Sequence, residues 1–180
     1  MIKLCLIFGC WSVLLVSLLA ADGVSNQSGL STTATESYQI RNKKFGDLLR
    51  PENASGAEGA RIVLYPAEPW KCMTWKLQPV GDAIFRVQNH FTAKTFIVKS
   101  GDGDKAVVQA KLLPEKSEQS LWRFVKLADG AYEICDAKSG TALTAVEVAG
   151  GSARIVAALW SGTDNQKWSL EKIDPATLTM

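Results

Sequence analysis

The sequence of 180 residues is poor in the side chains on which most enzyme and metal sites depend. It has a single histidine, His90, and four cysteines. Zinc sites and acid–base catalysis usually draw on histidine, and no serine or cysteine stands in a motif that marks an activated nucleophile. The sequence therefore predicts a protein that is not an enzyme, with no catalytic residues, no metal and no cofactor.

A large charge of one sign is also missing, because 20 Lys and Arg residues are balanced by 18 Asp and Glu residues. Binding to a nucleic acid backbone takes many positive charges on one surface, so nucleic acid is not expected as a partner. The loop Gly101–Asp104 has two acidic residues but lacks the ligand series and the closing glutamate of an EF-hand. This loop predicts a solvated turn and no calcium site.

The N-terminus carries the one long apolar run of the chain, which extends from Leu4 to Ala21 and turns polar at Asp22. A lysine precedes the run, and together they have the layout of a secretory signal. We expect a signal peptide over residues 1–23 and a secreted protein, in a periplasmic or extracellular location. The run of 18 residues is also just long enough for a membrane helix. Contact with a membrane is therefore expected only if this segment is not cleaved.

Polar residues flank the part of the chain that is expected to fold. Residues 24–37 are small and polar and predict a disordered linker, and residues 174–180 predict a loose tail. Cleavage of the signal would leave two cysteines, Cys72 and Cys135. Because these two fall on different repeats of the pattern described next, we expect both to be unpaired.

Most of the chain is a threefold repeat with a period of 46 or 47 residues. Each unit has an aromatic residue near its start, a large apolar residue further on and a tryptophan near its end. These residues are Tyr38, Leu49 and Trp75 in the first unit, Phe85, Phe96 and Trp122 in the second, and Tyr132, Leu143 and Trp168 in the third. The predicted repeats are residues 38–82, 83–129 and 130–173.

Within each unit apolar and polar residues alternate, as in Tyr132-Glu133-Ile134, and turn formers such as Gly150-Gly151 separate the short runs. A period of two favours strands, and four strands fit in one unit. Three such units would close on one another around a threefold axis, which buries the repeated aromatic positions and removes exposed sheet edges. The fold class is therefore all-β, in one domain over residues 38–173.

The end of the third unit carries the motif on which a family resemblance depends. Asn165-Gln166-Lys167-Trp168 is a Gln-x-Trp motif, and Ser139–Leu143 lies upstream of it. With these residues the unit resembles the ricin B-type lectin repeat. The resemblance extends over residues 38–173, and it implies a β-trefoil and a carbohydrate-binding function. The motif is intact only once, because the first unit has Met73-Thr74-Trp75 in its place.

The resemblance also implies where a sugar would bind. Such lectins cover the apolar face of the sugar with an aromatic ring and bond its hydroxyls with a carboxylate and an amide. In the third unit these positions hold Trp160, Thr144 and Asn165, and Gln166 matches the glutamine that braces the pocket from behind. Because the Thr144 hydroxyl lacks the charge of a carboxylate, we expect weak binding unless a nearby acidic residue reaches in. Whether Trp160 is a stacking platform or a packing residue is left open.

The other two units depart further from the family pattern. In the first unit the ring, carboxylate and amide positions hold Tyr65, Arg50 and Cys72, so that only the ring is retained. In the second unit the carboxylate position holds Ile97 and the amide position Gln119. We expect a second candidate site at Tyr65 and none on the second unit.

The sequence therefore predicts a secreted carbohydrate-binding module with a degenerate sugar pocket that is best preserved on the third repeat. The expected partner is a glycan or polysaccharide, bound weakly by a monomer, with multivalent binding left open. The candidate ligand-binding residues are Trp160, Asn165, Gln166, Thr144 and Tyr65. The alternative is a β-trefoil whose sugar sites have decayed and which binds or inhibits a protein, since the family carboxylate is missing from all three units.

Overall fold

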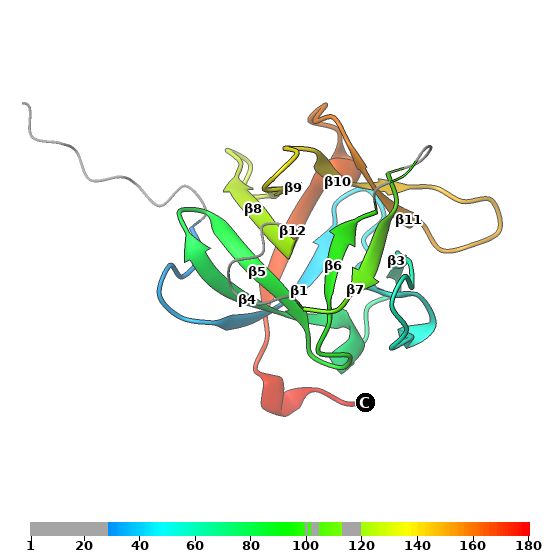
Figure 1. The fold of residues 1–180 in the computed structure, drawn as a ribbon, viewed down its shortest axis with the longest axis horizontal. Coiled ribbons are helices and arrows are strands. Elements are labelled where there is room, and N and C mark those ends of the chain that lie inside the picture. Colours follow the sequence, from blue (N-terminus) through cyan, green and yellow to red (C-terminus); the bar gives the residue numbers. More distant parts are fainter. Residues whose placement is uncertain (1–28, 100, 102–104, 113–119) are drawn as a thin grey trace, which may run out of the picture.

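The computed structural model describes residues 29–99, 101, 105–112 and 120–180, so the predicted signal peptide lies outside the described residues. These residues form twelve strands, four in each repeat, joined by turns and short 3-10 helices (Figure 1). The strands are β1 (Glu36–Asn42), β2 (Leu48–Pro51), β3 (Ile62–Tyr65), β4 (Thr74–Gly81), β5 (Ile84–Asn89), β6 (Thr95–Val98), β7 (Val107–Ala110), β8 (Leu121–Lys126), β9 (Tyr132–Asp136), β10 (Ala142–Val146), β11 (Arg154–Ala158) and β12 (Lys167–Lys172). The predicted all-β fold class is confirmed. Among the described residues, no helix is long and apolar enough to cross a membrane.

Six of the strands close into a barrel, to which each repeat contributes its first and last strand. β1 pairs with β4 and β12, β5 pairs with β4 and β8, and β9 pairs with β8 and β12, all antiparallel. The ring joins the two ends of the folded chain, since Tyr38 lies opposite Lys172. A closed ring leaves no unpaired sheet edge in the barrel.

The second and third strands of each repeat form three hairpins, β2–β3, β6–β7 and β10–β11. The hairpins also contact one another, because β11 pairs with β3 and isolated bridges join Arg61 to Val108 and Ala106 to Val156. A six-stranded barrel with three mutually linked hairpins is the β-trefoil that the family resemblance implied.

The repeated tryptophans tie each hairpin to the barrel. All three are fully buried, and in each repeat the indole Nε1 donates a hydrogen bond of 3.0 Å to the carbonyl oxygen of the large apolar residue on the second strand. The donor and acceptor pairs are Trp75 and Leu49, Trp122 and Phe96, and Trp168 and Leu143. The buried N–H groups are thus satisfied, and the predicted core role of the three tryptophans is confirmed.

In the first and second repeats, the turn after the first strand holds the loop that precedes the tryptophan of a neighbouring repeat. In the first repeat, Asn42 accepts hydrogen bonds from the backbone N–H groups of Lys44 and Phe45, and its amide donates to the carbonyl oxygen of Asn165 at 3.1 Å. Asn89 does the same for the second repeat, with its amide donating to the carbonyl oxygen of Cys72 at 2.9 Å. The predicted site loop of the third repeat is therefore anchored by the first.

Both ends of the folded part pack more closely than the sequence predicted. Within the predicted linker, Leu30 is 6% exposed and belongs to the main core, and β1 already begins at Glu36. Residues 24–28 of that linker lie outside the described residues. In the predicted loose tail, the Thr179 N–H donates to the carbonyl oxygen of Pro69 at 2.8 Å, and the Thr179 carbonyl accepts from the Lys71 N–H at 3.0 Å. The tail therefore holds the loop before β4.

The two cysteines of the trefoil are unpaired, as expected, and both are buried. Burial raises the pKa of the Cys72 thiol and raises the pKa of the Cys135 thiol to about 11. Both thiols are therefore protonated at neutral pH, and they behave as small apolar side chains of the core.

Candidate functional site

Trp160 lies just after β11, on the loop that leads to the Gln-x-Trp motif. Its side chain is 37% exposed, whereas Trp168, which closes the same repeat, is fully buried. The neighbouring Leu159 is 83% exposed. The loop therefore presents an aromatic ring and an aliphatic side chain to solvent, in a part of the repeat where the family pattern places its ring.

Gln166 holds this loop from both sides of Trp160. Its amide nitrogen donates to the carbonyl oxygen of Leu159 at 2.8 Å, and its amide oxygen accepts from the Ser161 N–H at 2.7 Å and from the Ser161 hydroxyl at 2.9 Å. The Gln166 side chain is only 2% exposed, so these bonds are shielded from water. The backbone on either side of the indole is thus fixed to one buried side chain.

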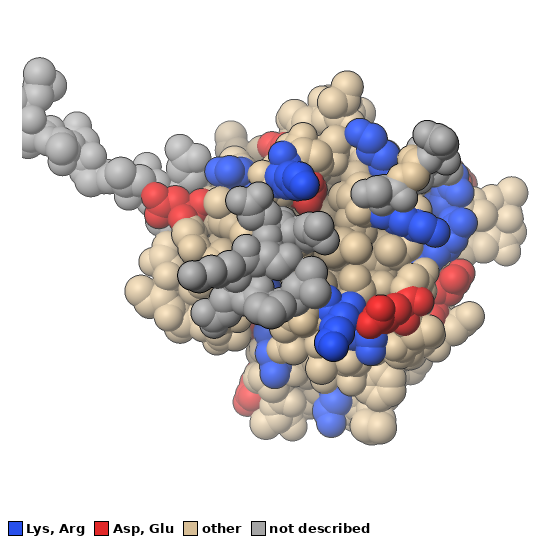
Figure 2. Space-filling model, in the orientation of Figure 1, with Lys and Arg blue, Asp and Glu red and all other residues tan. Residues whose placement is uncertain are grey.

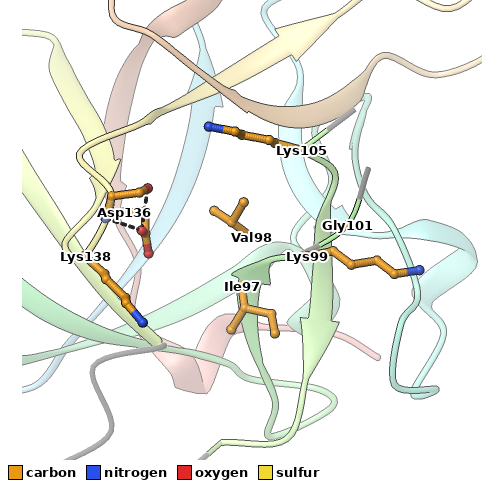
Figure 3. Close-up of a pocket in the computed structure, with 8 residues that line it drawn as sticks. Ile97, Val98, Lys99, Gly101, Lys105, Asp136 and Lys138 are labelled. Carbon is orange, nitrogen blue, oxygen red and sulfur yellow. Dashed lines mark hydrogen bonds between the residues drawn. The ribbon is translucent and has the colours of Figure 1, made fainter. Parts of the chain in front are cut away.

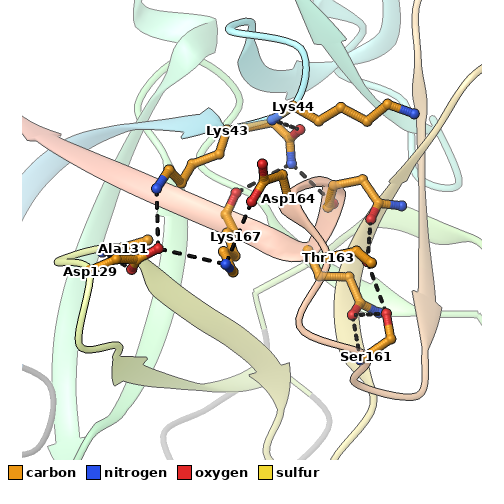
Figure 4. Close-up of polar contacts among 11 residues, drawn as sticks. Lys43, Lys44, Asp129, Ala131, Ser161, Thr163, Asp164 and Lys167 are labelled. Atoms are coloured by element: carbon orange, nitrogen blue, oxygen red, sulfur yellow. Dashed lines mark hydrogen bonds and ion pairs between the residues drawn. The ribbon is translucent and has the colours of Figure 1, made fainter.

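Asn165 lies next to this clamp and is partly exposed. Its amide nitrogen donates to the carbonyl oxygen of Ala145 at 3.1 Å, and its amide oxygen accepts from the Thr163 hydroxyl at 2.7 Å. The Thr163 and Ser161 hydroxyls are also hydrogen-bonded to each other at 2.9 Å, which completes a chain of polar contacts along the loop (Figure 4). The Asn165 amide is thereby oriented before any ligand arrives.

Thr144, which stands in the family carboxylate position, faces the inside of the protein. It is 6% exposed, its hydroxyl donates to the carbonyl oxygen of Ala142 at 2.9 Å, and the same oxygen accepts from the Gln166 amide at 3.0 Å. Thr144 therefore supports the Gln166 clamp, and its hydroxyl is already occupied on both its donor and its acceptor side.

A nearby carboxylate that could replace the missing one is engaged elsewhere. Asp164 forms an ion pair with Lys167 at 3.5 Å, and Lys167 also approaches Asp129 at 3.6 Å (Figure 4). Asp129 is held in addition by Lys43 at 3.2 Å. A hydrogen bond from the Ala131 N–H, followed by the bond from Lys43, lowers the pKa of the Asp129 carboxyl. These ion pairs connect the third-repeat loop, through Asp129, to Lys43 of the first repeat.

In the first repeat the candidate ring is covered. The guanidinium carbon of Arg50 lies 3.5 Å from the centre of the Tyr65 ring, and the Trp70 ring lies 6.0 Å from it, at a tilt of 32°. Cys72, in the amide position, is close enough to the Arg50 guanidinium for a hydrogen bond that partly offsets the rise in its pKa. The three family positions are thus together in space, and Arg50 occupies the place above the ring.

The second repeat has a cavity but no ring in it. The cavity has a volume of about 540 Å³, with Ile97 and Val98 between the side chains of Lys105 and Lys138 (Figure 3). Asp136 also lines it, but this carboxylate accepts hydrogen bonds from the N–H and the hydroxyl of Ser139, which belong to its own turn. Gln119, in the amide position, lies outside the described residues. None of the lining residues that the structure describes is aromatic, so they offer no platform for a sugar.

His90, the single histidine, contacts a serine. Ser37 Oγ lies 2.8 Å from His90 Nε2, and the His90 N–H donates to the carbonyl oxygen of Thr74 at 2.9 Å. Partial burial, followed by the charges of Lys76 and Lys71, lowers the pKa of the His90 imidazole. Ser37 is only 8% exposed within β1, so the pair links β1 to the turn after β5, and the Ser37 hydroxyl is not presented at the surface.

The structure therefore brings together four of the five predicted residues, Trp160, Asn165, Gln166 and Thr144, and places Tyr65 on a different repeat under Arg50. Sequence reasoning missed Ser161 and Thr163, which complete the polar chain along the loop. The signal for them was present in the sequence, because two hydroxyl residues lie between the exposed Trp160 and the motif.

Comparison with known proteins agrees with this geometry. Residues 118–180 match the family model described as a ricin-type beta-trefoil lectin domain-like family. The matched segment runs from just before β8 to the C-terminus, and it contains the Gln166 clamp. A search among curated proteins gave no match to the chain.

Solved structures share the fold. The designed threefold symmetric protein ThreeFoil is 28% identical, with a TM-score of 0.68 over 74% of this chain and 96% of that one. The agglutinin of Rhizoctonia solani is 20% identical, with a TM-score of 0.67 over 80% of this chain and 99% of that one. The C-half of the earthworm R-type lectin, solved in complex with GalNAc, is 15% identical, with a TM-score of 0.58 over 77% of this chain and 99% of that one. The shared fold confirms the β-trefoil, and the match over residues 118–180 shows that this part of the chain is similar to the ricin-type lectin family.

Proposed function

We propose that this protein is a secreted carbohydrate-binding module whose sugar site is the loop of the third repeat. The observation that carries the proposal is the exposed ring of Trp160, held on both sides by the buried Gln166 side chain. An aromatic ring that is fixed before binding loses little conformational freedom when a ligand stacks on it. The earthworm lectin that shares the fold was solved with a bound sugar, GalNAc, which supports the same ligand class here.

Each residue of the third-repeat loop has its own part in sugar binding. The Trp160 ring covers the apolar face of a sugar, and the Asn165 side chain, at the edge of the same loop, supplies hydrogen bonds to its hydroxyls. Gln166 and Thr144 act from behind, by keeping the loop in place. Because the family carboxylate is replaced by the inward-facing Thr144, a single site is weak, and binding becomes strong only when several copies of the protein meet several sugars.

A glycan array with the mature protein, residues 24–180, displayed on a multivalent carrier tests this proposal. We expect binding to a defined class of sugars, and we expect Trp160→Ala to abolish it. Phe91→Ala is the matched control, because Phe91 is an equally exposed ring, 43% against 37% for Trp160, on another repeat. Binding that is lost in the Trp160 variant and kept in the Phe91 variant assigns the site to the third-repeat loop.

If the protein binds no sugar on the array, although thermal unfolding shows that it is folded, the proposal is contradicted. That result would favour a trefoil that binds a protein, a role that the covered ring of Tyr65 on the first repeat also fits. Equal losses in the Trp160 and Phe91 variants would contradict the assignment of the site.

We also propose that the protein is exported with removal of residues 1–23. The apolar run from Leu4 to Ala21 and the polar residues after it support this proposal. The mass of the protein recovered outside the cell tests it. An intact N-terminus on a membrane-bound protein would show instead that the segment is an anchor.

A further inference from the structure

A second cavity lies on the first repeat, away from the loop of Trp160. It has a volume of about 310 Å³, at the lower end of the range of ligand pockets. Its walls come from the ends of β2 and β3, from β11 and from the long β10–β11 loop, which projects at the right of Figure 1. The lining residues are Arg50, Glu52, Asn53, Arg61, Val63, Val148, Gly151, Ser152 and Arg154.

Strand register gathers three arginines around this cavity. Val63 of β3 lies opposite Arg50 of β2 on one side and opposite Arg154 of β11 on the other. Directly opposed residues of antiparallel strands project from the same face of a sheet, and so do residues two apart on one strand. Arg61, two residues before Val63, therefore shares this face, and the three arginine side chains line one cavity with the buried Val63 between them in the sheet.

Arg50 is the buried charged side chain of this cavity. It is 8% exposed, it is stacked on the Tyr65 ring at 3.5 Å, and its Nε has no hydrogen-bond partner. Within the part of the chain that the structure describes, no carboxylate forms an ion pair with it. A buried positive charge is costly without an opposite charge. The Tyr65 phenol ring and the protonated Cys72 thiol beside Arg50 are neutral, and Glu52, which lines the same cavity, does not form an ion pair with it.

The rest of the cavity adds to the positive potential. Of the described lining residues, Glu52 is the one with a negative side chain, against three arginines. Figure 2 shows Lys and Arg side chains over the region of β7 and β11, with Asp and Glu side chains beside them. Asn53 and Ser152 supply neutral hydrogen-bond donors at the rim, and Gly151 leaves space for a ligand. Guanidinium groups are well matched to sulfate and carboxylate oxygens, because their N–H groups form a planar fork.

We propose that this arginine cavity binds the anionic group, sulfate or carboxylate, of an acidic saccharide. The first repeat has lost the carboxylate of a sugar-binding pocket and has gained Arg50 in the same position, so that the preferred charge of the ligand is inverted. The saccharide part of this inference rests on the proposed function. The anion part stands on the geometry of the cavity alone.

Titration calorimetry at constant ionic strength tests the inference with four ligands: galactose 6-sulfate, galacturonic acid, galactose and inorganic sulfate. Asn53 begins an Asn-x-Ser sequon at the mouth of the cavity. The protein should therefore be produced in a host that does not glycosylate asparagine. We expect galactose 6-sulfate or galacturonic acid to bind at least about tenfold more tightly than galactose, the effect of one charge-assisted hydrogen bond. Both should also bind more tightly than inorganic sulfate, which lacks the contacts of the sugar.

Two variants locate the site. Arg61 is exposed, so Arg61→Glu should fold normally and weaken binding of the acidic sugar by about tenfold or more. Arg123→Glu is the matched control, since Arg123 is an equally exposed arginine on β8 outside the cavity, and it should leave binding nearly unchanged. Arg50→Gln tests the buried charge itself, and its thermal unfolding shows whether the variant is folded.

Three results would overturn the inference: neither acidic sugar binds better than galactose, the Arg123 variant weakens binding as much as the Arg61 variant, or inorganic sulfate alone binds as tightly as the sugars. Trp160→Ala separates this inference from the proposed function, because it should abolish glycan binding by the third repeat and leave the arginine cavity intact. If the protein binds acidic sugars but no neutral glycans, the inference is supported and the third-repeat site is contradicted.

Discussion

The first and third repeats each carry an aromatic ring near the end of their third strand, but the two rings differ in exposure. Tyr65, the last residue of β3, is half-buried, whereas Trp160, two residues after the end of β11, is exposed. In the third repeat, Gln166 holds the backbone on both sides of Trp160 and leaves the ring 37% exposed. In the first repeat, Arg50 lies on the Tyr65 ring at 3.5 Å. The two hairpins, β2–β3 and β10–β11, have the same strand pairing, so one threefold scaffold carries an exposed ring and a ring covered by an arginine.

Two repeat positions account for this difference. Where the third repeat has Gln166, the first has Met73, which is fully buried and offers no hydrogen bonds to a loop. Where the third repeat has the inward-facing Thr144, the first has the long side chain of Arg50. The loop of the first repeat is held instead by the C-terminal tail, through the backbone bonds of Thr179. Each loop thus has its own support, and each can be altered separately.

The largest expected effect separates the two tryptophans of the third repeat. Trp168→Ala removes a fully buried ring and its bond to the carbonyl of Leu143, and it should lower the free energy of unfolding by about 3 to 5 kcal/mol. Trp160→Ala should leave that free energy nearly unchanged and abolish glycan binding. Denaturant unfolding of both variants checks the prediction. An equal loss of stability in the two variants would place Trp160 in the core.

The next largest effect comes from breaking the clamp. Gln166→Ala removes four hydrogen bonds, among them the one to the buried Thr144 hydroxyl, at a cost of about 1 to 3 kcal/mol. Glycan binding should be lost with it, although Trp160 is still present. Gln166→Glu is the graded control, because its carboxylate still accepts from Ser161 but cannot donate to Leu159 or Thr144. Full binding by the alanine variant would show that the clamp does not hold the ring.

A smaller effect should follow from uncovering the first-repeat ring. Arg50→Ala removes the guanidinium that stacks on Tyr65 and should cost about 1 kcal/mol of stability. Nitration of Tyr65, followed by mass spectrometry, should become faster in this variant. Arg50→Lys keeps the charge without the planar stack, so it should give an intermediate rate. An unchanged nitration rate in Arg50→Ala would mean that Arg50 does not shield the ring.

The smallest expected effect is a pH dependence of stability that comes from His90, next to the loop of the first repeat. His90 bonds the carbonyl of Thr74 beside the first-repeat loop, whereas the equivalent residue of the next repeat boundary, Lys43, bonds the carbonyl of Lys167. Folding lowers the pKa of the His90 imidazole through partial burial and the charges of Lys76 and Lys71, so protonation favours the unfolded chain. The stability that His90 contributes is complete above pH 6.5, its ordinary pKa, and is lost as the pH falls through its lower folded value.

Thermal unfolding between pH 7.5 and pH 5.5, about one unit on either side of the ordinary value, measures this loss. His90→Gln, which cannot titrate, should flatten the change. The same slope in the wild type and the variant would assign it to other groups.

The sequence was sufficient for the fold because the fold repeats. Columns such as Trp75, Trp122 and Trp168 recur in phase, and each copy confirms the others, so the all-β trefoil and its core could be predicted. The packing of Leu30 and of the tail at Thr179 could not, since a single leucine or a pair of backbone bonds leaves no pattern in a polar stretch.

The site was predictable only in part, for a related reason. The motif around Gln166 identified which residues of the third repeat lie together. It could not show that the Thr144 hydroxyl turns inward or that Arg50 lies on the Tyr65 ring, because side-chain rotamers depend on neighbours from other strands. The covered ring of the first repeat became visible only with the structure.

The pairing of β1 with β12 has a consequence for how the chain folds. The first strand of the barrel finds one of its partners at Lys167–Lys172, near the opposite end of the sequence. Contacts between residues so far apart in sequence make folding slow, because the whole intervening chain must be ordered before they form. The barrel cannot be completed before β12 has formed, and until then β1 and β9 each keep an open edge on which two unfinished chains can join.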